Sequence, residues 1–180
     1  PSQSSAAATG LSTGNYIVTV LDSNGCTMMI SVTISEPPQI TSTINSNNVD
    51  CFGNSTGSSS LNISGGTPAY SYLWNNGQTT QNAAGLSAGN YSVIITDNNG
   101  CSSTAAVLIT EPSAMAVAVS IDDTICPNQN TTISANASGG TNPYTYFWQP
   151  NVGFGNSQTV SPVSTTTYTA IVTDAHGCTN

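Results

Sequence analysis

Hydrophobic and polar residues alternate in short runs along the whole chain, and turn-forming residues separate the runs. Each run is rich in β-branched and aromatic residues, and clusters of Gly, Pro, Asn and Asp follow at intervals of about 8–12 residues. In the middle of the chain the runs are residues 39–45, 58–64, 69–74, 79–86, 91–97 and 103–110, of which 79–86 is the weakest. No helical periodicity with capping residues occurs. The pattern predicts an all-β fold of antiparallel sandwiches.

The pattern of runs recurs with a period of about 75 residues, as in a tandem repeat. The phrase that contains Tyr91 and ends at Cys101 has a close copy that ends at Cys26 and a looser copy that ends at Cys178. Further positions keep nearly the same spacing: Glu36 with Glu111, Cys51 with Cys126, Trp74 with Trp148 and Tyr91 with Tyr168. We therefore expect each unit to fold on the same plan.

The repeat divides the chain into three units. Residues 1–37 are the C-terminal half of a truncated unit, residues 38–112 are a complete unit, and residues 113–180 lack the last strand. We expect the sequence to be a segment cut from a longer tandem array. The alternative, a complete small protein, would leave unpaired strand edges that invite aggregation. Such edges would also let copies complete one another by strand addition, which would build a filament.

Two aromatic positions in each unit refine the predicted fold class. Trp74 lies on the third predicted strand, where an immunoglobulin-type sandwich places its core aromatic residue. Tyr91 follows a tight turn, as in a tyrosine corner, whose hydroxyl hydrogen-bonds to backbone a few residues upstream. Trp148 and Tyr168 are their counterparts in the last unit. We expect all four in the cores of tandem immunoglobulin-like sandwiches, similar to PKD and fibronectin type III domains.

Five cysteines occur, and their places in the repeat suggest a bonding scheme. A complete unit has one cysteine before its second strand and one after the Asn-Gly turn. We therefore expect Cys51 to bond Cys101 and Cys126 to bond Cys178, while Cys26 lacks its partner because its unit is truncated. Disulfides would indicate an oxidising compartment. A seven-strand immunoglobulin connection would instead put the two cysteines of a unit at opposite ends of the sandwich, and the sequence leaves this open.

Composition narrows the range of partners. The chain has 180 residues, no Lys or Arg, and a formal net charge of −8. Without basic side chains it cannot neutralise phosphates, so nucleic acid and anionic membrane surfaces are poor partners. No apolar run approaches the roughly 18 residues of a membrane-spanning helix. We expect neither nucleic-acid binding nor membrane insertion.

Several short motifs of the complete unit together carry a resemblance to a known family. They are Cys51-x-Gly53, Gly65-Gly66-Thr67-Pro68-x-Tyr70, Trp74, Leu86-x-Ala88-Gly89-x-Tyr91, Asp97-x-x-Gly100-Cys101 and Glu111-Pro112. This set resembles the SprB-type repeat of giant cell-surface adhesins of gliding Bacteroidetes, and the last unit is similar to the PKD-like domains of those proteins. The resemblance implies export by the type IX secretion system, an extracellular position on the cell surface, and no enzyme activity. It also implies neighbouring repeats of the same long chain as partners.

The acidic residues lie at predicted turns and linkers, outside the strands. Asp caps turns through its own side chain, which explains most of these positions. The sharper hypothesis is a calcium site, because a Cys51–Cys101 disulfide would bring Asp50 and Asp97 together and oxygen ligands suit Ca²⁺. No other cofactor is expected.

No set of residues in the sequence predicts catalysis. The chain has one histidine, His176, no Lys or Arg, and no paired acids expected in a cleft. Asp123-Thr124-Ile125 resembles the short acceptor motif of Bacteroidetes O-glycosylation, which makes Thr124 a candidate glycosylation site.

Two classes of function remain. The first is a stiff spacer or stalk within a surface adhesin or filament, because short linkers that contain Pro restrict hinge motion. The second is a carbohydrate-binding module that recognises surface polysaccharide, with Tyr70, Tyr72, Tyr144 and Tyr146 as stacking surfaces. Exposed rings would favour the second class, and buried rings the first. An accessory domain of an enzyme is a third class.

Overall fold

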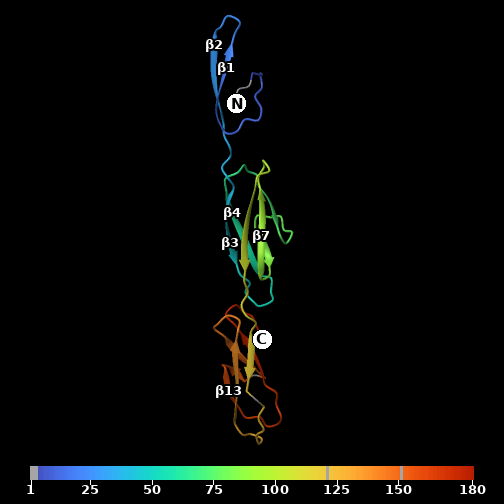
Figure 1. Ribbon diagram of the computed structural model, residues 1–180. Coiled ribbons are helices and arrows are strands. Elements are labelled where there is room, and N and C mark those ends of the chain that lie inside the picture. Colours follow the sequence, from blue (N-terminus) through green and yellow to red (C-terminus); the bar gives the residue numbers. More distant parts are fainter. Residues whose placement is uncertain (1–3, 121, 151) are drawn as a thin grey trace.

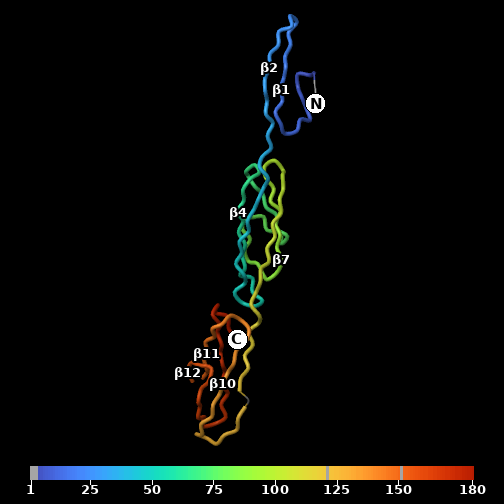
Figure 2. Tube along the Cα trace, turned by 60° about the vertical axis from the view of Figure 1, so that its left-hand side comes forward, coloured from blue at the N-terminus to red at the C-terminus, as the bar shows by residue number. Residues whose placement is uncertain are grey.

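The computed structural model describes residues 4–120, 122–150 and 152–180, and the chain forms an elongated molecule whose strands follow one another in three groups (Figures 1 and 2). The described residues form strands and no helix, as the alternating pattern predicts. Accordingly, no described helix has the length and apolar character needed to cross a membrane. The strands are β1 (Gly14–Leu21), β2 (Thr27–Ile34), β3 (Thr41–Asn47), β4 (Gly57–Ser64), β5 (Ser71–Trp74), β6 (Ala83–Leu86), β7 (Gly89–Thr96), β8 (Ser102–Ile109), β9 (Ala116–Val119), β10 (Thr131–Ser138), β11 (Thr145–Gln149), β12 (Gly153–Phe154), β13 (Ser157–Val160) and β14 (Thr169–Thr173).

The middle group is an antiparallel sandwich of two sheets. One sheet has the order β3-β4-β6 and the other the order β5-β7-β8. Labelled A, B, E and C, F, G, these strands have the arrangement of an immunoglobulin-type sandwich without strand D. The predicted fold class is therefore confirmed for this group.

The short strands β5 and β6 together make one passage along the sandwich. β5 pairs with the end of β7 that runs from Val93 to Thr96, whereas β6 pairs with Ser59 to Gly57 at the start of β4. The chain changes sheets between them. Only three passages therefore separate the loop before β4 from the turn after β7, so these two loops lie at opposite ends of the sandwich.

The core of the middle group lies between its two sheets. Trp74 is 1 % exposed, and Val93 and Ile95 are fully buried because alternate residues of β7 point inward. The Trp74 indole N–H donates to the carbonyl oxygen of Thr80 at 2.9 Å, so the buried polar atom has a partner. Tyr91 is half-buried against this core, and its hydroxyl donates to the carbonyl oxygen of Ser87, as a tyrosine corner requires.

The third group repeats this plan. Its sheets are β9-β10-β13 and β12-β11-β14, which correspond in position to β3-β4-β6 and to β5-β7 of the middle group. Trp148 is buried like Trp74, and its indole N–H donates to the carbonyl oxygen of Gly155 at 2.9 Å. Tyr168 is half-buried.

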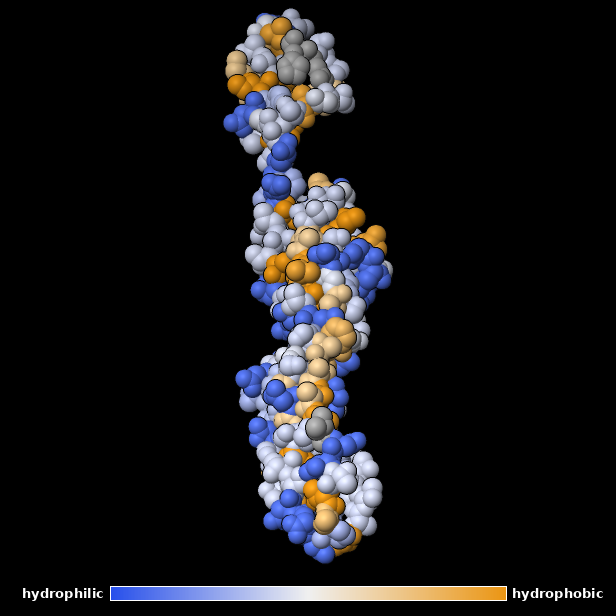
Figure 3. Space-filling view, turned by 60° about the horizontal axis from the view of Figure 1, so that its bottom comes forward, coloured by the Kyte–Doolittle hydropathy of each residue, from blue (hydrophilic) through white to orange (hydrophobic). Residues whose placement is uncertain are grey.

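The first group is a single hairpin of β1 and β2, the counterpart of β7 and β8. Tyr16 keeps the corner, since its hydroxyl donates to the carbonyl oxygen of Ser12 at 2.8 Å. Large apolar side chains remain exposed on the face that corresponds to the inner face of β7 and β8, including Val18, Val20, Met28 and Ile30. In the middle group the facing sheet covers the equivalent inner surface, whereas here this surface is uncovered. Figure 3 shows hydrophobic patches on this upper part of the molecule.

Candidate functional site: the junction between units

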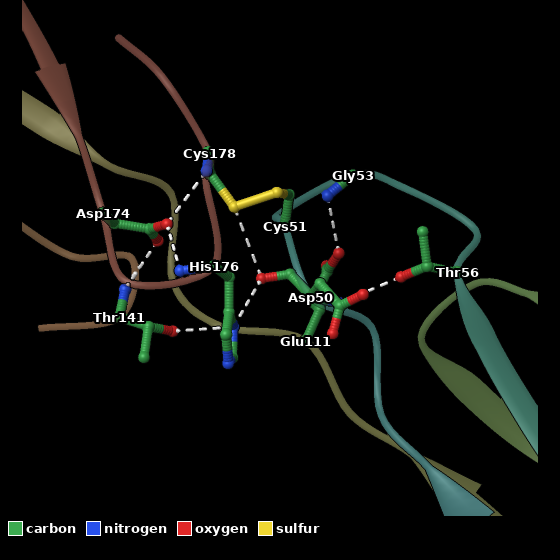
Figure 4. Close-up of a disulfide and its surroundings, with 9 residues drawn as sticks. All are labelled: Asp50, Cys51, Gly53, Thr56, Glu111, Thr141, Asp174, His176 and Cys178. Carbon is green, nitrogen blue, oxygen red and sulfur yellow. Dashed lines mark hydrogen bonds between the residues drawn. A yellow bond between two sulfur atoms is a disulfide. The ribbon is translucent and has the colours of Figure 1, made fainter.

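The described residues contain one disulfide, and it joins two units. Cys51, in the loop between β3 and β4, bonds Cys178, in the turn after β14, over a sequence separation of 127 and with the Cα atoms 5.7 Å apart (Figure 4). Cys26, Cys101 and Cys126 are free and exposed. The predicted bonds Cys51–Cys101 and Cys126–Cys178 are therefore wrong.

The length of the strands explains why no bond forms within a unit. Val49 pairs with Thr110 at one end of β8, and Cys101 directly precedes the other end. At about 3.3 Å per residue, this eight-residue strand spans roughly 26 Å. A disulfide needs Cα atoms within about 7 Å, so Cys51 cannot reach Cys101 at the far end of its own unit. In the third group, β10 separates Cys126 from Cys178 in the same way.

Contacts within the middle group hold the Cys51 loop against the end of β8. The Val49 N–H donates to the carbonyl oxygen of Thr110 at 2.9 Å, and the Thr110 N–H donates to Oδ1 of Asn48 at 3.0 Å. The Gly53 N–H donates to Oε2 of Glu111 at 2.7 Å. Since Glu111 follows β8 in the linker, these bonds tie the linker to the loop that carries Cys51.

The linker is also bound to the unit that follows. The Gly140 N–H donates to the carbonyl oxygen of Ser113 at 2.8 Å, and the side-chain amide of Asn180 donates to the carbonyl oxygen of Met115 at 2.7 Å. The segment between Thr110 and Met115 is thus hydrogen-bonded to the unit before it and to the unit after it. The main chain crosses the junction through this segment, and the Cys51–Cys178 disulfide is a second, separate covalent connection.

A buried aspartate shapes the turn that carries Cys178. Oδ1 of Asp174 accepts the backbone N–H groups of His176 and Cys178 at 2.9 Å, and Oδ2 accepts the N–H of Thr141 at 2.8 Å. A Cβ added to Gly140 would lie 2.8 Å from Oδ2, so the glycine makes room for the carboxylate. The aspartate therefore fastens the turn to the Gly-Gly-Thr motif of its own unit.

The middle group contains the same arrangement around Asp97. Its Oδ1 accepts the N–H groups of Asn99 and Cys101, and its Oδ2 accepts the N–H of Thr67. The turn-capping role predicted for this aspartate is present, and the link to Thr67, 30 residues away in sequence, adds to it. Two recurring motifs, Gly-Gly-Thr and Asp-x-x-Gly-Cys, thus meet at one end of each sandwich.

These hydrogen bonds lower the pKa of both carboxyl groups. The N–H of Thr67 is the strongest influence that holds the pKa of Asp97 below its ordinary value of 3.8; burial opposes it, and the N–H groups of Cys101 and Asn99 add to it. For Asp174 burial favours the neutral form, but the N–H groups of Thr141, Cys178 and His176 outweigh it and its pKa is also lowered. Both groups are therefore charged at neutral pH.

Acidification should destabilise the middle unit through Asp97. A carboxyl group whose pKa is lower in the folded state stabilises the fold above its unfolded pKa, and this contribution is lost as the pH falls through the folded pKa. We expect the melting temperature of the chain to hold steady down to about pH 4 and to fall below it. The Asp97→Asn variant should melt lower at pH 7 and lose less on acidification.

Calorimetry across a pH series, with Asp122→Asn as the control, checks this expectation. Asp122 is exposed, so its substitution should leave both the melting temperature and its acid decline unchanged. An acid decline of the Asp97→Asn variant equal to that of the parent chain would show that Asp97 does not cause it.

His176 lies beside the disulfide and completes the junction. Its Nδ1 lies 3.2 Å from the carbonyl oxygen of Asp50 and 3.3 Å from Oγ1 of Thr141, so it bridges the two units (Figure 4). The Sγ atom of Cys178 lies 3.4 Å from the carbonyl oxygen of Asp50. A shallow cleft of about 440 Å³ opens at this point, lined by Phe52, Met115 and others. Asp174 also lines this cleft, and both of its carboxylate oxygens are occupied by backbone N–H groups.

The predicted calcium pair is not assembled. Asp50 lies at the junction with the third group, whereas Asp97 lies in the turn at the far end of β8, and the bond that was to join their loops does not form. Both carboxylate oxygens of Asp97 accept backbone N–H groups. Within the described ranges, no three His, Cys, Asp or Glu residues gather as metal ligands would. The shared site of Asp50 and Asp97 was therefore wrong.

The remaining predicted site residues lie apart from the junction. Thr124 is exposed, as a modified residue must be. The four tyrosines proposed to stack on sugars, Tyr70, Tyr72, Tyr144 and Tyr146, are all half-buried. Tyr70 and Tyr144 donate their hydroxyls to the carbonyl oxygens of Gly65 and Gly139. The tyrosine rings therefore pack on their own units and offer little free face.

Comparisons with known proteins agree with the repeat. The family model of the SprB repeat matches residues 43–79 and residues 118–153, one stretch in each of the last two units. No curated protein matches the chain. A solved structure described as "Structural basis for Dscam isoform specificity" matches with 12 % sequence identity and a TM-score of 0.33, over 86 % of this chain and 49 % of that one. This chain thus spans about half the length of that structure.

Proposed function

Since the chain carries two SprB repeats, we propose that this segment is a stiff, non-catalytic spacer in a large secreted bacterial surface adhesin or filament. SprB repeats are a structural, non-catalytic repeat family, typical of surface adhesins. The disulfide is consistent with a location outside the cytoplasm. Export by the type IX secretion system and a part in gliding motility belong to the same proposal.

The observation that carries the proposal is the doubly connected junction. A single flexible linker would let two units bend and twist freely. Here the main chain crosses the junction between Thr110 and Met115, and the Cys51–Cys178 bond crosses it a second time. Two covalent connections at different points oppose both bending and twisting, which is the mechanical property that a spacer needs.

The surface supports the same role. With no basic residue and a net charge of −8, copies of the chain repel one another and do not bind polyanions. The side chains of β7 and β8 that point away from the core are mainly small or aliphatic, with Ile94 and Leu108 about half exposed.

Carbohydrate binding is the second candidate, and the exposed rings that favour it are Phe52 and Phe154. A glycan array probed with the 180-residue chain separates the two functions. The spacer proposal predicts no carbohydrate signal above that of a denatured sample. Binding that is lost in a Phe52→Ala or Phe154→Ala variant would replace the spacer proposal with the carbohydrate-binding one.

A further inference from the structure

Cysteines equivalent to the two that form the observed disulfide also occur in the other units, where they have no bonding partner. Cys51 and Cys126 occupy the same place in their units, as do Cys101 and Cys178. We propose that Cys126 and Cys101 each form this same bond with a further SprB-type unit stacked on their end of the molecule, so that every junction in a stack carries one disulfide. The inference depends on the repeat and the observed bond, and it stands whether or not the array acts as a spacer.

The loop that holds Cys126 is already folded like the loop that holds Cys51. The Asn54 N–H donates to the carbonyl oxygen of Cys51 at 3.1 Å, and the Gln129 N–H donates to that of Cys126 at 3.1 Å. Gly53 has a φ of 76°, and its counterpart Asn128 has a φ of 65°, which is unusual for a residue with a side chain. The third group thus keeps the disulfide-forming turn without a bond to stabilise it.

The turn that holds Cys101 matches the turn that holds Cys178. The Asp97 N–H donates to the carbonyl oxygen of Cys101 at 2.9 Å, and the Asp174 N–H donates to that of Cys178 at 3.0 Å. In both turns the aspartate carboxylate accepts the cysteine N–H, at 2.8 and 2.9 Å. Cys101 is therefore presented by the same frame as its bonded counterpart.

The linkers before the middle and third groups are held by equivalent hydrogen bonds. The Gly66 N–H donates to the carbonyl oxygen of Pro38 at 2.6 Å, as the Gly140 N–H does to that of Ser113. The linker that enters the middle group thus meets it in the same way as the linker that enters the third group. A complete unit before the middle group, of which residues 1–37 are the later half, would therefore bring its own early cysteine toward Cys101.

The bonded cysteines are less exposed to solvent than the free ones. Cys51 and Cys178 are half-buried at their junction, whereas Cys101 and Cys126 are exposed, as is Cys26, the counterpart of Cys101 in the first unit. Stacking of another unit would cover these thiols and supply the partner. In forming the bond, the two thiols lose two protons and two electrons, which a disulfide oxidant such as oxidised glutathione accepts as it becomes two thiols.

A longer chain in which residues 38–112 occur twice in succession tests the inference, because it creates one new junction between identical units. After oxidation with glutathione disulfide, the proposal predicts a bond from Cys51 of the first copy to Cys101 of the second, besides the bond to Cys178. The longer chain should then titrate the same number of free thiols as this chain, which has Cys26, Cys101 and Cys126 free.

Matched single substitutions identify the partner. Cys101→Ser in the second copy should raise the number of free thiols by one, whereas the same change in the first copy should lower it by one. The reverse result would show bonds within units, and two extra thiols in the unsubstituted longer chain would show that no new bond forms. Either result overturns the inference, and the bond to Cys178 in the same molecule reports that the chain has folded.

Discussion

Removal of the Cys51–Cys178 bond should turn a fixed junction into a hinge. Cys101 and Cys126 are exposed cysteines near the two far ends of the joined units, so spin labels there report the geometry of the pair. In a Cys26→Ser background we expect a narrow distance distribution by electron–electron double resonance. Adding Cys51→Ser and Cys178→Ser together should broaden it clearly, because one of the two covalent connections is then lost.

The same variants should also lose stability. The chain-entropy argument gives about 4–5 kcal/mol for a loop of this length when both units unfold together. Calorimetry of the double variant should show a lower melting temperature, and the two units should melt in separate transitions. Cys126→Ser is the matched control, since it removes an equivalent cysteine that has no bond here. A distance distribution equally narrow with and without the disulfide would mean that the linker alone fixes the junction.

Truncation of Trp74 should have the largest effect on a single unit. The side chain is 1 % exposed at the centre of the core, and its indole N–H satisfies the carbonyl group of Thr80. Substitutions of buried Trp by Ala cost about 3–5 kcal/mol, a large part of the stability of a small domain. Urea unfolding of Trp74→Ala, followed by circular dichroism, should show the middle unit unfolded or close to its midpoint without denaturant.

Leu73 provides the control on the same strand. Its side chain points away from the core and is 53 % exposed, so Leu73→Ala should change the unfolding free energy by less than about 0.5 kcal/mol. Equal losses from Leu73→Ala and Trp74→Ala would contradict the assignment of β5 as a strand with one buried face.

The strands and the core residues of the complete unit could be predicted from local patterns. Period-two alternation depends only on neighbouring residues, so the runs ending at Trp74 and beginning at Tyr91 can each be identified as strands without knowledge of the rest of the fold. The tyrosine corner is equally local, because the Tyr91 hydroxyl binds Ser87, four residues upstream. Such features depend on short stretches of sequence and can be predicted from one chain.

The disulfide partner could not be predicted, because it depends on the path of the chain. The runs that became β5 and β6 look like two full strands, but each is four residues long and together they make one passage. That difference moves Cys101 to the opposite end of the sandwich from Cys51. The calcium hypothesis failed with it, since it required the same two loops to meet.

The sequence repeat contains both the buried aspartates and the threonines whose N–H groups they accept. Asp97 and Asp174 recur with Thr67 and Thr141 in both units that contain the Gly-Gly-Thr motif, and each pair is hydrogen-bonded. The repeat shows that both units keep the two motifs, and the structure shows that the motifs touch. The contact of His176 with the carbonyl oxygen of Asp50 left no such signal, because it arises from the packing of one unit against the next.

Disulfide mapping of the non-reduced chain tests the central claim, that one bond locks neighbouring units together. Digestion with pepsin suits this chain, because it has no Lys or Arg and trypsin cannot cut it. Mass spectrometry should find one cross-linked product that contains Cys51 and Cys178, with Cys26, Cys101 and Cys126 unlinked. A product that links Cys51 to Cys101, or Cys126 to Cys178, would contradict the account.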